Sequence, residues 1–186
     1  MSGLHIVDIR NPETPAIVGS LDLSGFINSV AVEGDFAYLI EGVPNQPDWL
    51  HILNVADPTN PIQLGSLMMA GIVWELILSG DYLYVADYEQ GIRIVDVSDP
   101  SAPFFLSQWG TPHKYGIAVA GGFAYLTDDD DLTLLVIDVT DPTAPERRGS
   151  LQVAGRAAFG LGLSGDHVFI AEGENVTAKV VLLRTQ

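Results

Sequence analysis

The sequence predicts an all-β protein, a β-propeller of about four four-stranded blades that forms one domain over residues 1–186. Three observations predict this fold. Short apolar segments alternate with polar residues, turn residues separate them, and the whole pattern recurs roughly every 42–46 residues, the usual length of a propeller blade. No stretch has the periodicity of a long helix.

The turn residues mark the boundaries of the repeats. A Gly-Asp type hairpin recurs at residues 34–35, 80–81, 121–122 and 165–166, and an Asn/Asp-Pro pair recurs at 11–12, 57–58, 99–100 and 141–142. A Gly-Ser pair follows at 19–20, 65–66 and 149–150, with Leu106-Ser107 in the remaining copy. These signals divide the chain into a partial repeat at 1–23, repeats at 24–69, 70–110 and 111–153, and a partial repeat at 154–186.

Each complete repeat is expected to contain four strands, A to D, in sequence order. In the first complete repeat these strands fall near residues 30–32, 36–40, 50–55 and 62–67. The Gly-Asp hairpin joins strands A and B, and the Asp-Pro loop joins strands C and D. The prolines lie outside the strands, where their missing N–H removes no ladder hydrogen bond.

Strand A is expected to face the core with one set of residues and the central channel with the other. The expected core-facing residues are Val30, Val32, Leu76, Leu78, Ile117, Val119, Leu161 and Leu163, and the expected channel-facing residues are Ala31, Ile77, Ala118 and Gly162. Because the second set is mostly small, it favours a narrow axis with few blades.

The two partial repeats leave two ways to close the ring. Residues 4–9 and 16–21 form strands C and D, and the chain finishes with strands A and B at 159–163 and 167–171. The first strands could complete the last blade, which gives a four-bladed monomer without exposed edges. Residues 176–183 resemble a further strand C, so the tail lies elsewhere or the last blade has its own strand C. In the second closure, a homodimer forms an eight-bladed ring.

Composition and charge limit the kinds of partner and chemistry that the sequence predicts. Apolar residues make up 47% of the chain and charged residues 17%, which is typical of a folded domain. The net charge of −16 would repel a phosphate backbone, so no nucleic-acid partner is expected, whereas a basic partner or divalent cations fit. The chain has no cysteine and therefore no disulfide or thiolate chemistry. No apolar run is long enough to predict a membrane span, and the first residues show no signal-peptide pattern.

Four segments of the chain resemble a known repeat. They are GLHIVDIRNPETP, LHILNVADPTNP, GIRIVDVSDPSAP and LLVIDVTDPTAP, and they are similar to the LVIVD repeat, a β-propeller repeat of bacterial and archaeal proteins. The resemblance covers nearly the whole chain and implies a propeller, often extracellular or on the cell surface. It carries no catalytic residue, because the repeated residues are those of strands and turns.

The loops between strands B and C are acidic. They contain residues 41–48, Asp87-Tyr88-Glu89, Asp128-Asp129-Asp130-Asp131 and Glu172-Gly173-Glu174. Four consecutive aspartates can supply oxygen ligands to Ca²⁺. The run lacks the spacing and the glycine of a calcium loop, so a solvated turn is the alternative interpretation.

A ligand site is predicted at the mouth of the channel, where strand A begins. Equivalent positions there are Asn28, Trp74, Tyr115 and Phe159, followed by Ser29 and Glu75, with His113, Lys114 and Arg156 just before. Aromatic and polar groups that converge on a concave surface favour ligand binding, although the aromatic residues could instead pack between blades.

The leading functional hypothesis is a non-enzymatic binding or scaffold module that holds a protein, glycan or small ligand on its variable acidic face. The alternative is a hydrolase or lyase at the channel mouth, with or without a divalent cation, in which Glu75 and His113 act as acid and base. The other histidines, His5, His51 and His167, lie in strands and are expected to be surface or packing residues. No catalytic motif is present.

Overall fold

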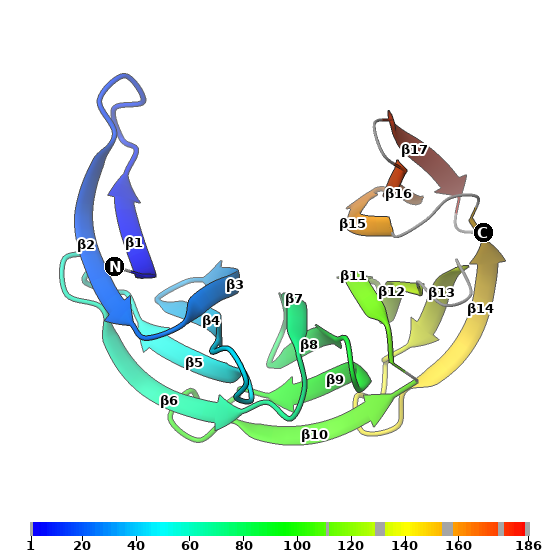
Figure 1. Ribbon diagram of the computed structural model, residues 1–186, viewed down its shortest axis with the longest axis horizontal. Helices are drawn as coiled ribbons and strands as arrows, with labels where there is room; N and C mark the ends of the chain where they lie inside the picture. The colour runs from blue at the N-terminus through cyan, green and yellow to red at the C-terminus, as the bar shows by residue number, and fades with distance from the viewer. Residues whose placement is uncertain (1, 111, 129–132, 154–157, 175–176, 185–186) are drawn as a thin grey trace.

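The computed structural model describes residues 2–110, 112–128, 133–153, 158–174 and 177–184, and its antiparallel sheets follow one another around an open arc (Figure 1). The first sheet pairs β1 (Ser2–Asp8) with β2 (Ala16–Leu23). Three four-stranded sheets follow. Their strands are β3 (Phe26–Glu33), β4 (Phe36–Gly42), β5 (Trp49–Asn54) and β6 (Ile62–Met68); β7 (Val73–Ser79), β8 (Tyr82–Asp87), β9 (Gly91–Asp96) and β10 (Phe104–Trp109); β11 (Lys114–Ala120), β12 (Phe123–Asp128), β13 (Thr133–Asp138) and β14 (Glu146–Gln152). The last sheet contains β15 (Ala158–Ser164), β16 (His167–Glu174) and β17 (Thr177–Arg184).

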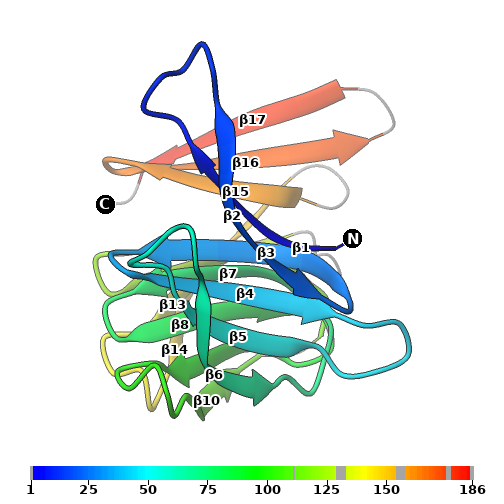
Figure 2. The same cartoon turned by 90° about the vertical axis from the view of Figure 1, so that its left-hand side faces the viewer.

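The strand order confirms the predicted repeat. Within each four-stranded sheet the strands pair in sequence order, which is the predicted order A, B, C, D. The first strand of each sheet, here called the inner strand, lies on the concave side of the arc, and the fourth lies on the convex side (Figures 1 and 2). The part of the chain that the structure describes contains strands and no helix, so none of its elements is a helix of the length and apolarity needed to cross a membrane.

The repeated turn residues have clear structural reasons. Gly34, Gly80 and Gly165 have φ of 56°, 60° and 53°, the left-handed region in which an L side chain is strained, and this conformation closes each tight hairpin. In the Asp-Pro turns, the aspartate carboxylate accepts hydrogen bonds from the residue two positions later. Asp99 Oδ1, for example, accepts from the backbone N–H of Ser101 at 2.9 Å and from its hydroxyl at 2.7 Å.

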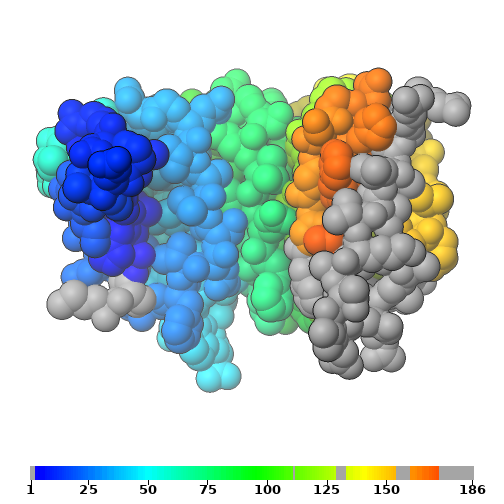
Figure 3. Space-filling model, turned by 90° about the horizontal axis from the view of Figure 1, so that it is seen from above, coloured from blue at the N-terminus to red at the C-terminus, as the bar shows by residue number. Residues whose placement is uncertain are grey.

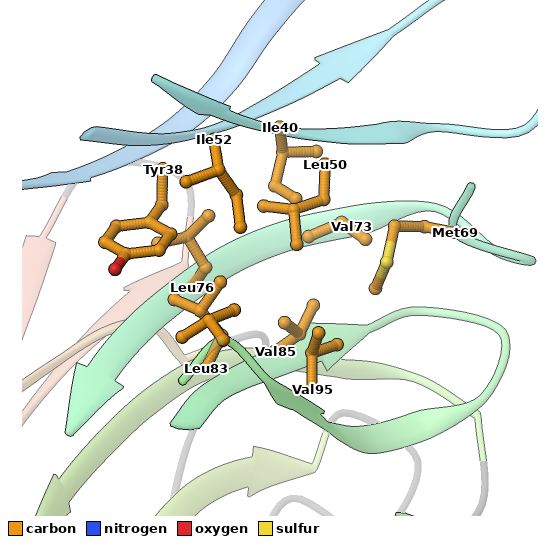
Figure 4. Packing of buried hydrophobic residues seen from close by; sticks show 11 residues of the cluster. Tyr38, Ile40, Leu50, Ile52, Met69, Val73, Leu76, Leu83, Val85 and Val95 are labelled. Atoms are coloured by element: carbon orange, nitrogen blue, oxygen red, sulfur yellow. The ribbon is translucent and has the colours of Figure 1, made fainter. Parts of the chain in front are cut away.

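The core is a series of apolar clusters between neighbouring sheets. The cluster in Figure 4 joins the β3–β6 sheet to the β7–β10 sheet and includes Tyr38, Ile40 and Ile52 on one side with Leu76, Leu83 and Val85 on the other. Because each central sheet is covered on both faces, residues on both sides of a strand can be apolar. β5 and β9 accordingly contain nearly continuous buried runs.

The expected core-facing residues Leu76, Leu78, Ile117 and Val119 do pack in the core, but two of the expected channel-facing residues do not face a channel. Ala31 packs in the cluster that contains Leu76 and Leu78 of the next sheet, and Ile77 packs in the cluster that contains Ile117. Alternate residues of an inner strand therefore point toward the two neighbouring sheets, and the small residues were no measure of the width of a channel. Val30 and Val32 are 51% and 63% exposed. In the β3–β6 sheet, Leu4, Leu21 and Leu23 from β1 and β2 pack against β4 and β5, and Val30 and Val32 lie outside that cluster.

The ring is not closed within the described chain, and the split-blade closure is not observed. β16 pairs with β15 on one side and with β17 on the other, so β1 has no edge of β16 to join. The last sheet thus has its own third strand, which was the alternative interpretation of residues 176–183. β1 pairs with β2 at the opposite end of the arc (Figure 1).

Candidate functional site

A β-bulge occurs at the same place in every inner strand. The register shifts between Ile27 and Ser29 in β3, and between Val73 and Glu75 in β7. Equivalent shifts bracket Tyr115 and Gly116 in β11 and Phe159 in β15. A bulge leaves one residue out of the ladder and redirects its side chain. The predicted mouth residues Asn28, Trp74, Tyr115 and Phe159 are these bulge residues.

The structure brings several of the predicted site residues together. An open cavity of about 360 Å³, here called the inner recess, is lined by Asn28, Ser29, Trp74, Glu75 and Tyr115. Trp74 is 49% exposed, and its ring lies 5.5 Å from the Tyr115 ring, centroid to centroid, at an interplanar angle of 46°. Because these residues come from three neighbouring sheets, the recess exists only when the sheets are packed.

Polar side chains of the recess hold the inner strands to one another. Ser29 Oγ accepts a hydrogen bond from the backbone N–H of Leu76 at 3.3 Å. At the equivalent position one sheet further on, Glu75 Oε2 accepts from the N–H of Ile117 at 2.9 Å. Burial raises the pKa of Glu75, and this hydrogen bond opposes the shift. Glu75 therefore has a structural role, with its carboxylate at the wall of the recess.

His113 and Lys114 lie outside the inner recess. His113 has φ of 67°, its backbone N–H donates to Tyr88 O at 2.6 Å, and its ring lies 4.7 Å from the Tyr88 ring. Lys114 is buried, and its Nζ lies 2.8 Å from Asp128 Oδ2 in a separate cavity of about 240 Å³. Arg156 lies outside the described residues, and so does the side chain of Phe159.

The aspartate run proposed as a calcium site is only partly described. Asp128 is the last residue of β12, is buried and pairs with Lys114, whereas Asp129, Asp130 and Asp131 lie outside the described residues. Across the ranges that are described, no group of three or more His, Cys, Asp or Glu side chains could hold a metal ion.

In three of the predicted acidic loops the first acid belongs instead to a strand and is buried. Glu41, Asp87 and Asp128 occupy the sixth position of β4, β8 and β12. Glu41 Oε2 lies 2.8 Å from His51 Nε2, and Asp87 Oδ2 lies 3.6 Å from Arg93 Nη1. His51 and Arg93 both occupy the third position of the neighbouring strand, which is the sequence signal that could have revealed these pairs.

The pKa values of Glu41 and Asp87 shift in opposite directions. Burial works against ionisation of Glu41, but hydrogen bonds from the Gly25 N–H, His51 and Ser24 lower its pKa. At Asp87 burial dominates and raises the pKa, although the N–H groups of Glu89 and Gln90 and the charge of Arg93 oppose it. Within the described residues, Asp87 Oδ2 and Arg93 Nη1 have no hydrogen-bond partner.

A second and larger cavity lies beside the recess, between the β4–β5 and β6–β7 connections. Its volume is about 640 Å³, and residues 42–48, residues 70–72, Phe26, Asn28 and Glu89 line it. It is here called the loop cavity. Asn28 is shared with the inner recess, so the two spaces adjoin on the concave end of the β3–β6 sheet.

The chain is similar in fold to several solved structures. A protein from Lactobacillus plantarum matches at 17% identity and a TM-score of 0.80, over 99% of this chain and 64% of that protein. A functionally unknown protein from Desulfotomaculum acetoxidans matches at 12% identity and 0.77, over 98% and 62%. The Cps50 (Swd1) β-propeller domain of Myceliophteria thermophila matches at 13% identity and 0.66, over 89% and 60%. The chain thus spans less than two thirds of each of these three proteins.

No curated protein matches this chain. The family model of the LVIVD repeat matches four consecutive segments, residues 1–23, 24–69, 70–111 and 114–153. These segments agree with the repeats that the turn residues define, and they cover most of the sequence. The chain therefore belongs to the LVIVD repeat family.

Proposed function

We propose that this protein is a binding module that holds a small polyhydroxylated ligand, such as a sugar ring, in the inner recess. The observation that carries the proposal is the half-exposed Trp74 indole, which lies against Tyr115 beside the carboxylate of Glu75. An apolar ring face flanked by a few polar groups is the usual composition of a small-ligand site.

The recess offers complementary chemistry to a sugar ring. The exposed indole provides a flat apolar surface for the C–H face of the ring, and aromatic side chains contribute much contact area with little loss of entropy. The carboxylate of Glu75, the amide of Asn28 and the hydroxyl of Ser29 line the same space and can exchange hydrogen bonds with ligand hydroxyls. All three side chains are held by bonds to the next sheet, which favours a preformed site.

The test is a titration with a panel of mono- and oligosaccharides, followed by calorimetry and tryptophan fluorescence. We expect Trp74→Ala to weaken saccharide binding by about tenfold or more, because aromatic anchors dominate such sites. Trp49→Ala is the matched control, since Trp49 is 37% exposed at the start of β5 and does not line the recess. Equal effects of the two substitutions, or no binding to any saccharide, would overturn the proposal.

A further inference from the structure

The loop cavity contains a carboxylate that is buried and held in place. Asp48 is only 5% exposed, and its Oδ2 accepts a hydrogen bond from the backbone N–H of Val73 at 2.8 Å. Its backbone carbonyl accepts from the N–H of Met69, also at 2.8 Å. These two bonds join the β4–β5 connection, which projects from the sheet (Figure 2), to the β6–β7 connection at Met69 and to the start of β7 at Val73. Asp48 is therefore a rigid part of the cavity wall.

The second oxygen of this carboxylate faces the space left by a glycine. A Cβ atom at Gly42 would lie 3.2 Å from Asp48 Oδ1 and 2.9 Å from Asn28 Nδ2, and all three residues line the cavity. Among the described residues no group donates a hydrogen bond to Oδ1. The backbone of Gly42 does not have positive φ, so the turn itself does not require a glycine here, and a side chain at this position would enter the space beside Oδ1. Within the described chain, the structure thus leaves the second oxygen of a largely buried carboxylate without a hydrogen-bond partner at the cavity.

A second carboxylate shares this cavity, and no described cation neutralises the two charges. Glu89 lines the same space, and its charge acts on Asp48. No lysine, arginine or histidine is among the residues that line the cavity. Burial and the charge of Glu89 raise the pKa of Asp48, against the hydrogen bond from Val73, and a cation placed between the two carboxylates would offset both effects.

The rest of the wall suits a cation that has an apolar stem. Phe26 and Ile72 are exposed apolar side chains, and both line the cavity together with Val43. A phenyl ring attracts a cation through its π face, and the methylenes of a lysine or arginine side chain pack on apolar surface. The net charge of −16 would also raise the rate at which a cation approaches.

We propose that the loop cavity is a binding site for an organic cation, a primary ammonium or guanidinium group on an apolar stem, which Asp48 and Glu89 hold by charge-assisted hydrogen bonds. Such a group can come from a free amine or from a lysine or arginine side chain of a protein. A divalent metal ion fits less well, because it needs more oxygen ligands than two carboxylates provide.

The experiment measures binding of defined probes by calorimetry at low ionic strength. The cationic probes are n-pentylamine and the N-acetyl methylamides of lysine and arginine, and the uncharged probes of matched shape are those of norleucine and citrulline. We expect the cationic probes to bind and their matched uncharged probes to bind at least about tenfold more weakly. Equal binding of n-pentylamine and the lysine derivative indicates a free amine, whereas tighter binding of the amino-acid derivatives indicates a protein side chain.

Variants connect this binding to the cavity. Asp48→Asn and Glu89→Gln are each expected to weaken cation binding by about tenfold or more, because each removes one charge from the site. Gly42→Ala should weaken cation binding, because its methyl group fills the space beside Asp48 Oδ1. This variant tests the cavity even if Asp48→Asn does not fold. Glu33→Gln is the matched control, since Glu33 is an exposed carboxylate at the other end of β3.

Three results would overturn the proposal. They are equal binding of the norleucine and lysine derivatives, unchanged affinity in both Asp48→Asn and Glu89→Gln, and binding of Ca²⁺ in preference to every amine. Asn28 lines both spaces, but Trp74 and Glu75 of the sugar site do not line the loop cavity. Trp74→Ala is therefore expected to leave cation binding unchanged, so a failure of one site is distinguishable from a failure of the other.

Discussion

Three buried carboxylates at the ends of second strands each lie beside a basic side chain. Glu41, Asp87 and Asp128 occupy equivalent positions, but the basic partner comes from the third strand in two sheets, as His51 and Arg93, and from the inner strand in the other. In that sheet Leu135 occupies the place of Arg93, and Lys114 is the basic partner. Different residues therefore supply a basic partner beside the carboxylate, which fits the high cost of leaving a buried carboxylate unpaired.

Removal of Arg93 is expected to destabilise the protein strongly. Arg93→Leu introduces the residue found at the equivalent position 135 but leaves Asp87 buried without a cation, and the free energy of unfolding should fall by about 3–5 kcal/mol. Asp87→Asn combined with Arg93→Leu should recover part of this loss, because asparagine still accepts from the N–H groups of Glu89 and Gln90. Urea unfolding followed by circular dichroism measures both. A fully stable Arg93→Leu protein would show that the pair is unimportant.

Glu75 is expected to make the stability of the protein depend on pH. Burial raises its pKa above the ordinary 4.5, so the folded chain binds this proton more tightly than the unfolded chain. The contribution of Glu75 to the free energy of unfolding is therefore fully present below pH 4.5 and is lost as the pH rises through the pKa of the folded state. Glu75→Gln keeps an acceptor for the Ile117 N–H without the charge.

The comparison of Glu75→Gln with the native protein isolates this effect. The stability gained by the substitution should be larger at about pH 7 than at about pH 4, as measured by urea unfolding at both values. Glu33→Gln serves as the control, because it makes the same change of charge at an exposed position. A gain for Glu75→Gln that is equal at both pH values would contradict the prediction.

The outer strands contact the turns of the neighbouring repeat through their fourth residue. A Cβ atom at Gly65 of β6 would lie 2.5 Å from Pro100 O in the next Asp-Pro turn, and one at Gly19 of β2 would lie still closer to Pro58 O in the turn of its neighbouring repeat. At the same position of β10, Ser107 donates its hydroxyl hydrogen bond to Pro142 O. The repeated Gly-Ser signal thus marks a contact between repeats and not a turn.

Substitutions at Gly65 test whether its close contact with the neighbouring turn stabilises the protein. Gly65→Ala is expected to lower stability by about 1–3 kcal/mol, because a methyl group must displace a backbone carbonyl. Gly65→Ser should cost less, since its hydroxyl can repeat the bond that Ser107 makes. Gly149→Ala is the matched control, because a Cβ at Gly149 would have no neighbour within 4 Å. Thermal unfolding measures all three, and equal losses for Gly65→Ala and Gly149→Ala would refute this account.

At the scale of elements, much of the candidate site was predictable from the repeat itself. Asn28, Trp74 and Tyr115 were singled out because they occupy equivalent positions, and three of the four sheets that contain an inner strand contribute to the recess. The bulges that direct them were not predictable, since the extra residue has no distinctive identity. The loop cavity was also missed. Asp48 looked like one acid among many in a polar loop, and only the fold buries it against Val73.

The open arc leaves an apolar face without a cover. Figure 3 looks into the open side of the molecule, where the surface of β3 lies between β1–β2 and β7. Val30 and Val32 are exposed on this strand, at the place where the inner strand of a preceding four-stranded sheet would pack. Elsewhere, the equivalent residues Leu76 and Leu78 lie in the core between sheets. Exposed apolar residues whose equivalents are buried or partly buried between sheets favour association.

We expect this face to be covered by a second copy of the chain, as in the predicted two-chain ring. Light scattering on a sizing column should then give a mass near twice the 20.0 kDa of one chain. Val30→Glu with Val32→Glu should shift the mass toward one chain, because charges on an apolar interface prevent its burial. Ile62→Glu, at an exposed site on the outer strand β6, is the control. A native protein that remains a single chain would contradict the expectation.

The sequence by itself determined the repeat, the strand order and the family, because strand periodicity and turn residues act over a few neighbouring residues. Gly80, the Asp99-Pro100 pair and the alternating segments around them carry that information locally. Tertiary structure decided which side chains meet across sheets: the Glu41–His51 pair, the Trp74–Tyr115 contact and the buried position of Asp48. It also decided that β17 occupies the edge of β16 and that the ring stays open. These outcomes depend on distances between segments far apart in the chain, which periodicity does not encode.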